Sequence, residues 1–131
     1  MTERDGLLES LRSELETIIK EELSKLGEIK TLIRGILMPL TIRIESEDKN
    51  YHLMVDGGGA VSLFSGLCGH PDITIFGKLD ELAYLMRTRD KNKFISDSKA
   101  GNLRVSPHTF KGLLAVAKLM ETFLAEQRHP N

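Results

Sequence analysis

The apolar residues near the N-terminus recur at steps of three and four residues, which is the period of a helix with one buried face. They are Leu8, Leu11, Leu15, Ile18, Ile19, Leu23 and Leu26, with Glu14, Glu16, Lys20 and Glu21 between them. This pattern predicts an amphipathic helix of about five turns. An uninterrupted heptad seam from Leu8 to Ile18 would next need an apolar residue where Glu22 stands. We therefore favour a helix packed on its own domain over a dimeric coiled coil.

Between Leu40 and Val105 the apolar residues alternate with polar ones, which is typical of half-buried strands. The alternation predicts five short strands, carried by Leu40, Ile42 and Ile44; Tyr51, Leu53 and Val55; Val61 and Leu63; Ile73 and Ile75; and Leu103 and Val105. The links between the first four strands are too short for crossover helices, and the glycines of Asp56–Gly59 tolerate the positive φ of a hairpin turn. We expect a mainly antiparallel sheet with one solvated face.

Two short elements and a long helix are predicted around the fifth strand. A helical spacing joins Leu79, Leu82, Ala83, Leu85 and Met86, and a second short turn follows around Phe94 and Ile95. Ser106-Pro107 has the form of a helix start and predicts a final helix that runs to about Ala125. Two apolar stripes cover most of that helix, formed by Phe110, Leu113, Leu114, Ala117, Met120 and Leu124 and by Val116, Leu119 and Phe123. Such a helix is normally buried on several sides, or it contacts an apolar molecule that is not protein.

Length and element order indicate one α+β domain over residues 1–131. A helical region occupies residues 1–38, and a five-stranded, twisted sheet with helices covering one face occupies residues 39–125. The 18 basic and 19 acidic residues give a net charge of -1. This balance supplies no global field for a phosphate backbone, so we expect no nucleic-acid partner.

The ends of the chain resemble no targeting signal. Residues 1–6 are polar and mixed in charge, and the last three residues match no retention or peroxisomal address. Lys118 and Glu121 interrupt the most apolar stretch, so no window approaches the roughly 18 apolar residues of a membrane span. Cys68 is the only cysteine, which excludes an intramolecular disulfide and a cysteine-rich zinc site. We expect a soluble, cytoplasmic protein.

Few residues suggest chemistry. Cys68 and His70 form the one candidate pair of nucleophile and base, but Gly69 and Pro71 make this segment a turn, and no oxyanion-hole motif accompanies it. The other histidines lack a spacing that converges on a metal. We therefore predict no catalytic residues, no metal and no cofactor.

A short basic run follows the predicted helix at residues 79–86. It contains Arg87, Arg89, Lys91 and Lys93, with Asp90 among them. Most runs of this kind are solvated surface that suits the end of a helix. Contact with lipid head groups or with an acidic partner is the alternative.

Three segments carry a resemblance to a known family. They are Tyr51–Gly57, Pro71–Ile75 and Gly101–Val105, the last running into the final helix. In order and spacing the chain from about Leu40 to Leu124 resembles the sterol carrier protein family of the type-2, nonspecific lipid-transfer kind. The sequence departs from the family pattern at Ser106–His108, where the family has a Gly-Asp pair.

The resemblance implies a non-catalytic domain that binds or carries a fatty acyl, lipid or sterol-like ligand in an apolar tunnel between the sheet and the C-terminal helices. Carried over by position, the tunnel would be lined by Leu82, Leu85, Met86, Phe94, Ile95, Leu103, Val105, Phe110, Leu113, Leu114, Ala117 and Met120. The implied partners are a hydrophobic small molecule and, transiently, a membrane. We expect a monomer or a weak homodimer.

Energetics bear on this expectation. An empty apolar cavity of about 300 Å³ costs on the order of 7 kcal/mol, against a total stability of about 5 to 15 kcal/mol. Such a pocket would therefore be filled or collapsed.

Two alternatives to a lipid carrier remain. One is an interaction or dimerisation module that uses the N-terminal or the C-terminal helix, and the other is an enzyme that uses Cys68 and His70.

Overall fold

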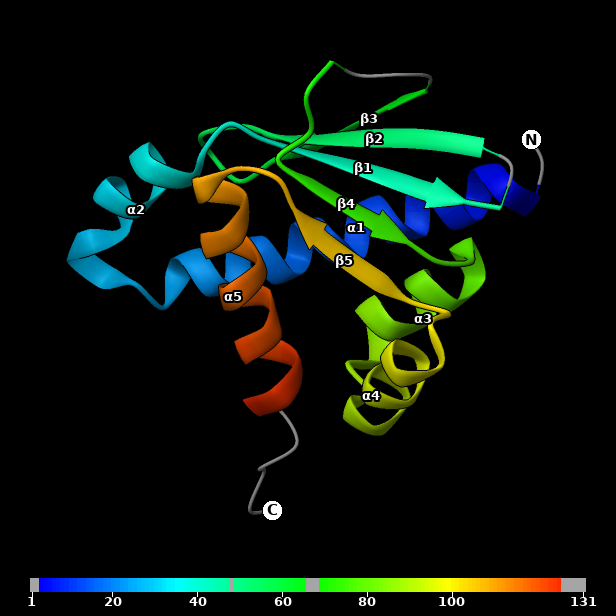
Figure 1. Cartoon of the computed structure of the whole chain (residues 1–131). Coiled ribbons are helices and arrows are strands. Elements are labelled where there is room, and N and C mark those ends of the chain that lie inside the picture. The colour runs from blue at the N-terminus through cyan, green and yellow to red at the C-terminus, as the bar shows by residue number, and fades with distance from the viewer. Residues whose placement is uncertain (1–2, 48, 66–68, 126–131) are drawn as a thin grey trace.

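The structure is a computed structural model that describes residues 3–47, 49–65 and 69–125. Figure 1 shows a twisted sheet with the helices gathered on one side of it. The elements in chain order are α1 (Glu3–Ser24), the 3-10 turn η1 (Gly27–Ile29), α2 (Lys30–Leu37), β1 (Leu40–Ser46), β2 (Lys49–Val55), β3 (Val61–Ser65), β4 (Ile73–Phe76), α3 (Leu79–Thr88), α4 (Lys91–Ala100), β5 (Arg104–Pro107) and α5 (Phe110–Ala125). The predicted α+β class is confirmed.

The sheet has the strand order β3-β2-β1-β4-β5. The pairs β1–β2, β2–β3 and β4–β5 are antiparallel, whereas β1 and β4 are parallel. The sheet is thus mainly antiparallel, as predicted, but mixed. The parallel pair arises because β4 adds to the free edge of β1 and does not pair with β3, the strand that precedes it in the chain.

Helix α1 supplies much of the hydrophobic core beneath the sheet. Leu8, Leu11, Leu15 and Ile18 are 2–6% exposed and pack with the inward-facing residues of β1, β2 and β4. This confirms the prediction that the helix packs on its own domain, because the residues of the heptad seam are covered within the chain.

The predicted glycine turn joins β2 to β3, and α1 lies against it. The Asp56 carboxylate accepts hydrogen bonds from the backbone N–H groups of Gly58 and Ala60, at 2.9 and 3.0 Å. Gly59 has a φ of +89°, and a Cβ there would lie 3.1 Å from a methyl group of Leu23 on α1. The backbone angle therefore favours glycine at this position, and a Cβ there would also force Leu23 to shift.

A pair of charged side chains fastens α1 to the beginning of β3. The Val61 N–H donates to Glu16 Oε2 at 3.1 Å, and Arg12 Nη1 donates to the Val61 carbonyl at 3.0 Å. The backbone hydrogen bond from Val61, helped by the one from Arg12, lowers the pKa of the Glu16 carboxyl.

Two predicted helix boundaries are wrong. The turn expected around Phe94 is a full helix, α4. The final helix begins at Phe110 and not at Ser106-Pro107, because those residues extend β5, where Ser106 pairs with Thr74. Proline is tolerated there because β5 is an edge strand.

A buried carboxylate fixes the start of α5 against the sheet. Asp72 is 6% exposed, and its two oxygens accept from the Thr41 N–H at 2.9 Å and the Thr109 hydroxyl at 2.8 Å. The Thr109 hydroxyl also accepts from the Gly112 N–H at 3.0 Å, as an N-cap does. Gly112 lies so close to this junction that a Cβ would stand 2.1 Å from the Asp72 carbonyl oxygen.

Candidate functional site

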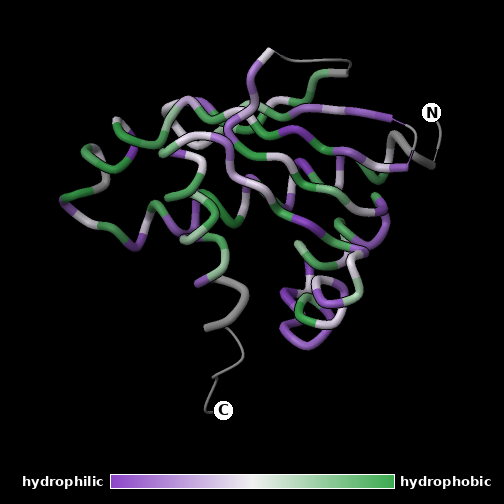
Figure 2. The backbone as a smooth tube through the Cα atoms, in the orientation of Figure 1, coloured by the Kyte–Doolittle hydropathy of each residue, from purple (hydrophilic) through white to green (hydrophobic). Residues whose placement is uncertain are grey.

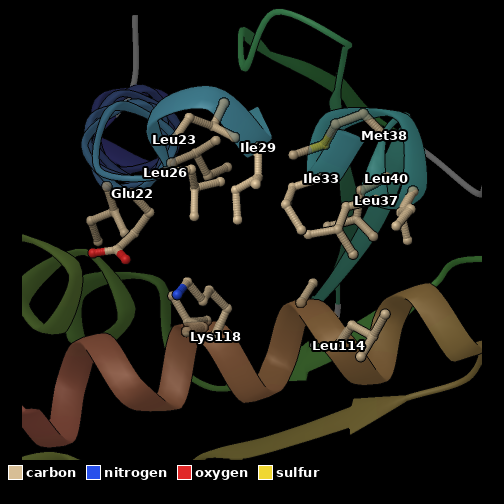
Figure 3. Close-up of a pocket in the computed structure, with 15 residues that line it drawn as sticks. Glu22, Leu23, Leu26, Ile29, Ile33, Leu37, Met38, Leu40, Leu114 and Lys118 are labelled. Carbon is tan, nitrogen blue, oxygen red and sulfur yellow. The ribbon is translucent and has the colours of Figure 1, made fainter. Parts of the chain in front are cut away.

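A pocket of about 370 Å³ lies between the second half of α1, α2 and α5 (Figure 3). Its walls are aliphatic apart from two charged side chains. The lining residues are Ile18, Ile19, Glu22, Leu23, Leu26, Ile29, Ile33, Ile36, Leu37, Met38, Leu40, Leu114, Ala115, Lys118 and Leu119. The pocket reaches the surface, because Ile29, Ile36 and Leu114 are 52, 46 and 37% exposed.

The pocket forms because the chain leaves the core after α1. Gly27 has a φ of +63°, which ends the run of α1 and starts the η1 turn. Helix α2 then lies beside the N-terminal half of α5 and away from the middle of the sheet (Figure 1). The apolar residues of α2 thus face α5 across a gap and do not fill the core.

Most of the ligand-lining residues predicted from the resemblance lie on the other side of α5. There, α3, α4, β5 and α5 enclose a void of about 20 Å³. Seven of the predicted residues line it: Leu82, Leu85, Met86, Phe94, Leu103, Val105 and Met120. A void of this size holds about one water molecule. In this structure these side chains pack as part of the core or against it.

The other five predicted residues are divided among three environments. Leu114 lines the 370 Å³ pocket. Ile95 packs against the core. Phe110 and Leu113 are 73 and 52% exposed, and Ala117 is exposed as well. The tunnel between sheet and C-terminal helices thus stays a prediction, while the larger pocket lies between α5 and the N-terminal helices.

The sequence analysis missed the contribution of α2 to this pocket. Residues 1–38 are predicted as a helical region, but no separate second helix is placed in it. The signal is present, since Ile29, Ile33, Ile36 and Leu37 recur at helical spacing. Gly27 marks where one helix ends and the next element begins.

The two charged residues of the pocket lie toward one end of it. Glu22 on α1 and Lys118 on α5 point toward each other across the gap in Figure 3. Glu22 also pairs with Lys25 at 3.1 Å, and Lys118 pairs with Glu121 at 3.4 Å. The pocket can therefore hold an apolar chain along α2 and a polar group beside Glu22 and Lys118.

The described histidines lie away from this pocket. His70 is exposed, and Cys68 lies outside the described residues. His108 Nε2 is 2.8 Å from the Thr74 hydroxyl at the edge of the sheet. Within the described ranges, no three His, Cys, Asp or Glu side chains come together as a metal site would require.

Three of the four basic residues in the run at residues 87–93 contact side chains of their own chain. Arg89 pairs with Glu21 at 2.7 Å, and Lys93 pairs with Asp97 at 3.0 Å. Arg87 lies over the Tyr84 ring at 5.7 Å. Among the helices of residues 3–125 that the structure describes, none has the length and apolar character of a membrane-spanning segment.

Comparison with known proteins places the fold. No family model matches the chain, and no curated protein matches it. Among solved structures, the chain is similar to the UbiJ-SCP2 ubiquinone synthesis protein, with a TM-score of 0.50 and 20% sequence identity over 82% of this chain and 90% of that one. The chain therefore has a sterol-carrier-like fold, as the resemblance in its sequence predicted.

Two further structures match with lower scores. Palmitated SCP2L2 from Aedes aegypti gives a TM-score of 0.46 at 17% identity, over 85% of this chain and 92% of that one. Sterol carrier protein domain 2 of Helicoverpa armigera gives 0.47 at 11% identity, over 84 and 85% of the two chains.

Proposed function

We propose that this protein binds a hydrophobic small molecule in the pocket between α1, α2 and α5 and carries it without catalysing a reaction. The pocket itself is the observation that carries the proposal. Its volume of about 370 Å³ falls within the range of about 300 to 1,000 Å³ that is usual for small-molecule sites, and its walls are aliphatic.

Water against these walls is unfavourable, which supports an apolar occupant. Ile29, Ile36 and Leu114 line the pocket and are 52, 46 and 37% exposed. Covering apolar surface stabilises a complex by about 25 cal/mol per Å². A fatty acyl or isoprenoid chain would cover these side chains together, and the similarity of fold to a ubiquinone synthesis protein makes an isoprenoid quinone a sensible probe.

The charged end of the pocket suits a ligand with a polar end. Glu22 and Lys118 carry opposite charges, so together they present little net charge to a bound group. An uncharged polar head can accept from the lysine and donate to the glutamate. A carboxylate head would face the like charge of Glu22.

Ligand recovery and uptake test the proposal. We expect organic extraction of gently purified protein, followed by mass spectrometry, to yield an acyl or isoprenoid species. The stripped protein should take up a fluorescent fatty acid and a short isoprenoid quinone. Recovery of no such species, together with no uptake of either probe by the stripped protein, would refute the proposal.

A pair of neighbouring substitutions localises the binding. Leu114→Arg removes part of the apolar lining and places a charge on the pocket wall, so it should lower affinity at least about tenfold. Leu113→Arg is the matched control, because Leu113 is 52% exposed and lies outside the pocket. Both variants should keep the circular-dichroism spectrum of the wild type. Equal affinities for the two variants would contradict the assignment of the pocket.

Photo-crosslinking separates this pocket from the predicted tunnel. A fatty acid with a diazirine on its chain should label α2 or the Leu114–Leu119 segment of α5. Labelling of α3 or α4 would instead place the ligand on the side where Leu82 and Phe94 lie.

A further inference from the structure

Most of the large apolar side chains that are exposed in the described part of the chain gather at one end of the molecule. Six exposed apolar residues lie on η1, α2 and the first turns of α5: Ile29, Leu32, Ile36, Phe110, Leu113 and Leu114. Leu32 is 64% exposed and Phe110 is 73% exposed. Figure 2 shows the apolar character of α2 and of the start of α5, which lie beside each other. We call these six residues the α2–α5 face.

This clustering exceeds what scattered surface residues produce. The other large apolar side chains known to be exposed are Met54, Phe64 and Tyr84, which belong to β2, β3 and α3. Single exposed apolar residues are ordinary, whereas a contiguous group marks a contact with another molecule or a membrane. The α2–α5 face is therefore a candidate docking surface.

The charge around the face indicates what docks on it. The elements that carry the face, residues 27–37 and 110–117, contain three basic residues, Lys30, Arg34 and Lys111, against one acidic residue, Glu28, in a chain whose net charge is -1. An apolar helix face with basic residues beside it matches the interface of a bilayer that contains anionic lipids. In a two-fold dimer the same basic residues would meet each other across the axis, which is unfavourable.

We propose that the α2–α5 face docks on membranes that contain anionic lipids. The apolar side chains enter the boundary between head groups and acyl chains, and Arg34 contacts the head groups. Ile29, Ile36 and Leu114 belong both to this face and to the lining of the pocket. Docking therefore sets the open side of the pocket against the lipid. This last step rests on the proposed function, but membrane binding itself does not.

Vesicle binding by the full chain tests the docking. We expect the wild type to sediment with vesicles of phosphatidylcholine and phosphatidylglycerol, and to bind phosphatidylcholine alone more weakly. High salt should reduce the difference in affinity between the two kinds of vesicle, since it screens surface charges. Arg34→Gln should weaken binding to the mixed vesicles about fivefold, the usual contribution of one basic residue near an anionic surface.

A matched pair of double variants locates the surface. Leu32→Glu with Phe110→Glu should weaken vesicle binding about a hundredfold, since two apolar anchors are lost. Met54→Glu with Phe64→Glu makes the same change of charge on the sheet, where these residues are 39 and 45% exposed, and should leave binding unchanged. Thermal unfolding checks that both double variants fold.

Three results would overturn the proposal. One is a wild type that binds neither vesicle, and another is an equal loss in the two double variants. The third is a dimer in light scattering that the Leu32 and Phe110 substitutions dissociate, which would make the face a contact between copies.

Ala115→Phe separates membrane docking from ligand binding in the pocket. This substitution fills the pocket and should abolish fatty-acid uptake while vesicle binding persists.

Discussion

Substitution of Gly112 by alanine should destabilise the protein, although the same change usually stabilises a helix. Alanine normally stabilises a helix interior by about 1 kcal/mol relative to glycine. At Gly112, however, a Cβ would lie 2.1 Å from the Asp72 carbonyl oxygen and 2.9 Å from its carbonyl carbon, and both are backbone atoms. Helix α5 would have to move away from Asp72 by on the order of 1 Å to restore ordinary contact distances.

That movement would break the junction that holds α5 on the sheet. The Asp72 carboxylate accepts the Thr109 hydroxyl at 2.8 Å, and the Asp72 carbonyl accepts the His108 N–H at 2.8 Å. A hydrogen bond to a charged group contributes about 1.5 to 3 kcal/mol, and overpacking costs about 1 to 3 kcal/mol. After the gain in helix propensity, we expect Gly112→Ala to lower the free energy of unfolding by about 3 kcal/mol.

Thermal or urea unfolding followed by circular dichroism measures this effect. The control is Gly35→Ala on α2, where an added Cβ meets nothing within 4 Å, so that variant should be more stable by up to about 1 kcal/mol. Because α5 carries Leu114 and Lys118 into the pocket, Gly112→Ala should also weaken ligand uptake. If Gly112→Ala stabilises the protein as Gly35→Ala does, the close approach of α5 to Asp72 is refuted.

Two further predictions concern charged side chains. The pKa of Glu16 is lowered in the folded protein by its hydrogen bond from Val61, so its contribution to stability is present above the ordinary glutamate pKa of about 4.3 and is lost as the pH falls through the folded-state value. Glu16→Gln should therefore flatten the acid side of the dependence of unfolding temperature on pH, and an unchanged profile would contradict this. In the pocket, Glu22→Gln should raise the affinity for a fatty acid, and Lys118→Gln should lower it. The affinity for a fatty alcohol should change less in titrations of both variants, and a fatty-acid affinity that neither variant alters would place the head group elsewhere.

The elements that follow from local pattern could be predicted from the sequence. Helix α1 and the five strands depend on a hydrophobic period, and the glycine turn depends on a backbone angle. In the structure the Leu8 to Ile18 face of α1 is buried, and Gly59 has a positive φ. Ser106-Pro107 misled the prediction because a helix-start signal competes with pairing to β4, and the pairing of Ser106 with Thr74 prevails.

The position of the pocket depends on tertiary contacts that no local pattern contains. The apolar residues around the final helix are more than one face of the sheet can bury. The sequence does not show on which side of the helix a pocket is left. That is decided by Asp72 and Gly112, which set where α5 crosses the sheet, and by Gly27, which turns α2 away from the core. Of the residues carried over from the resemblance, Leu114 faces that space, whereas Leu82 and its neighbours fill the other side.

Helix α2 has a consequence for how proteins of this architecture diversify. Among its residues whose side chains the structure describes, none belongs to the core or packs against it, so the part of the chain that shapes one wall of the pocket contributes little to whether the rest of the chain folds. Substitutions at Ile33, Ile36 or Leu37 can therefore alter what is bound at small thermodynamic cost. Selection for a different ligand and selection for a stable fold would act here on separate sets of residues.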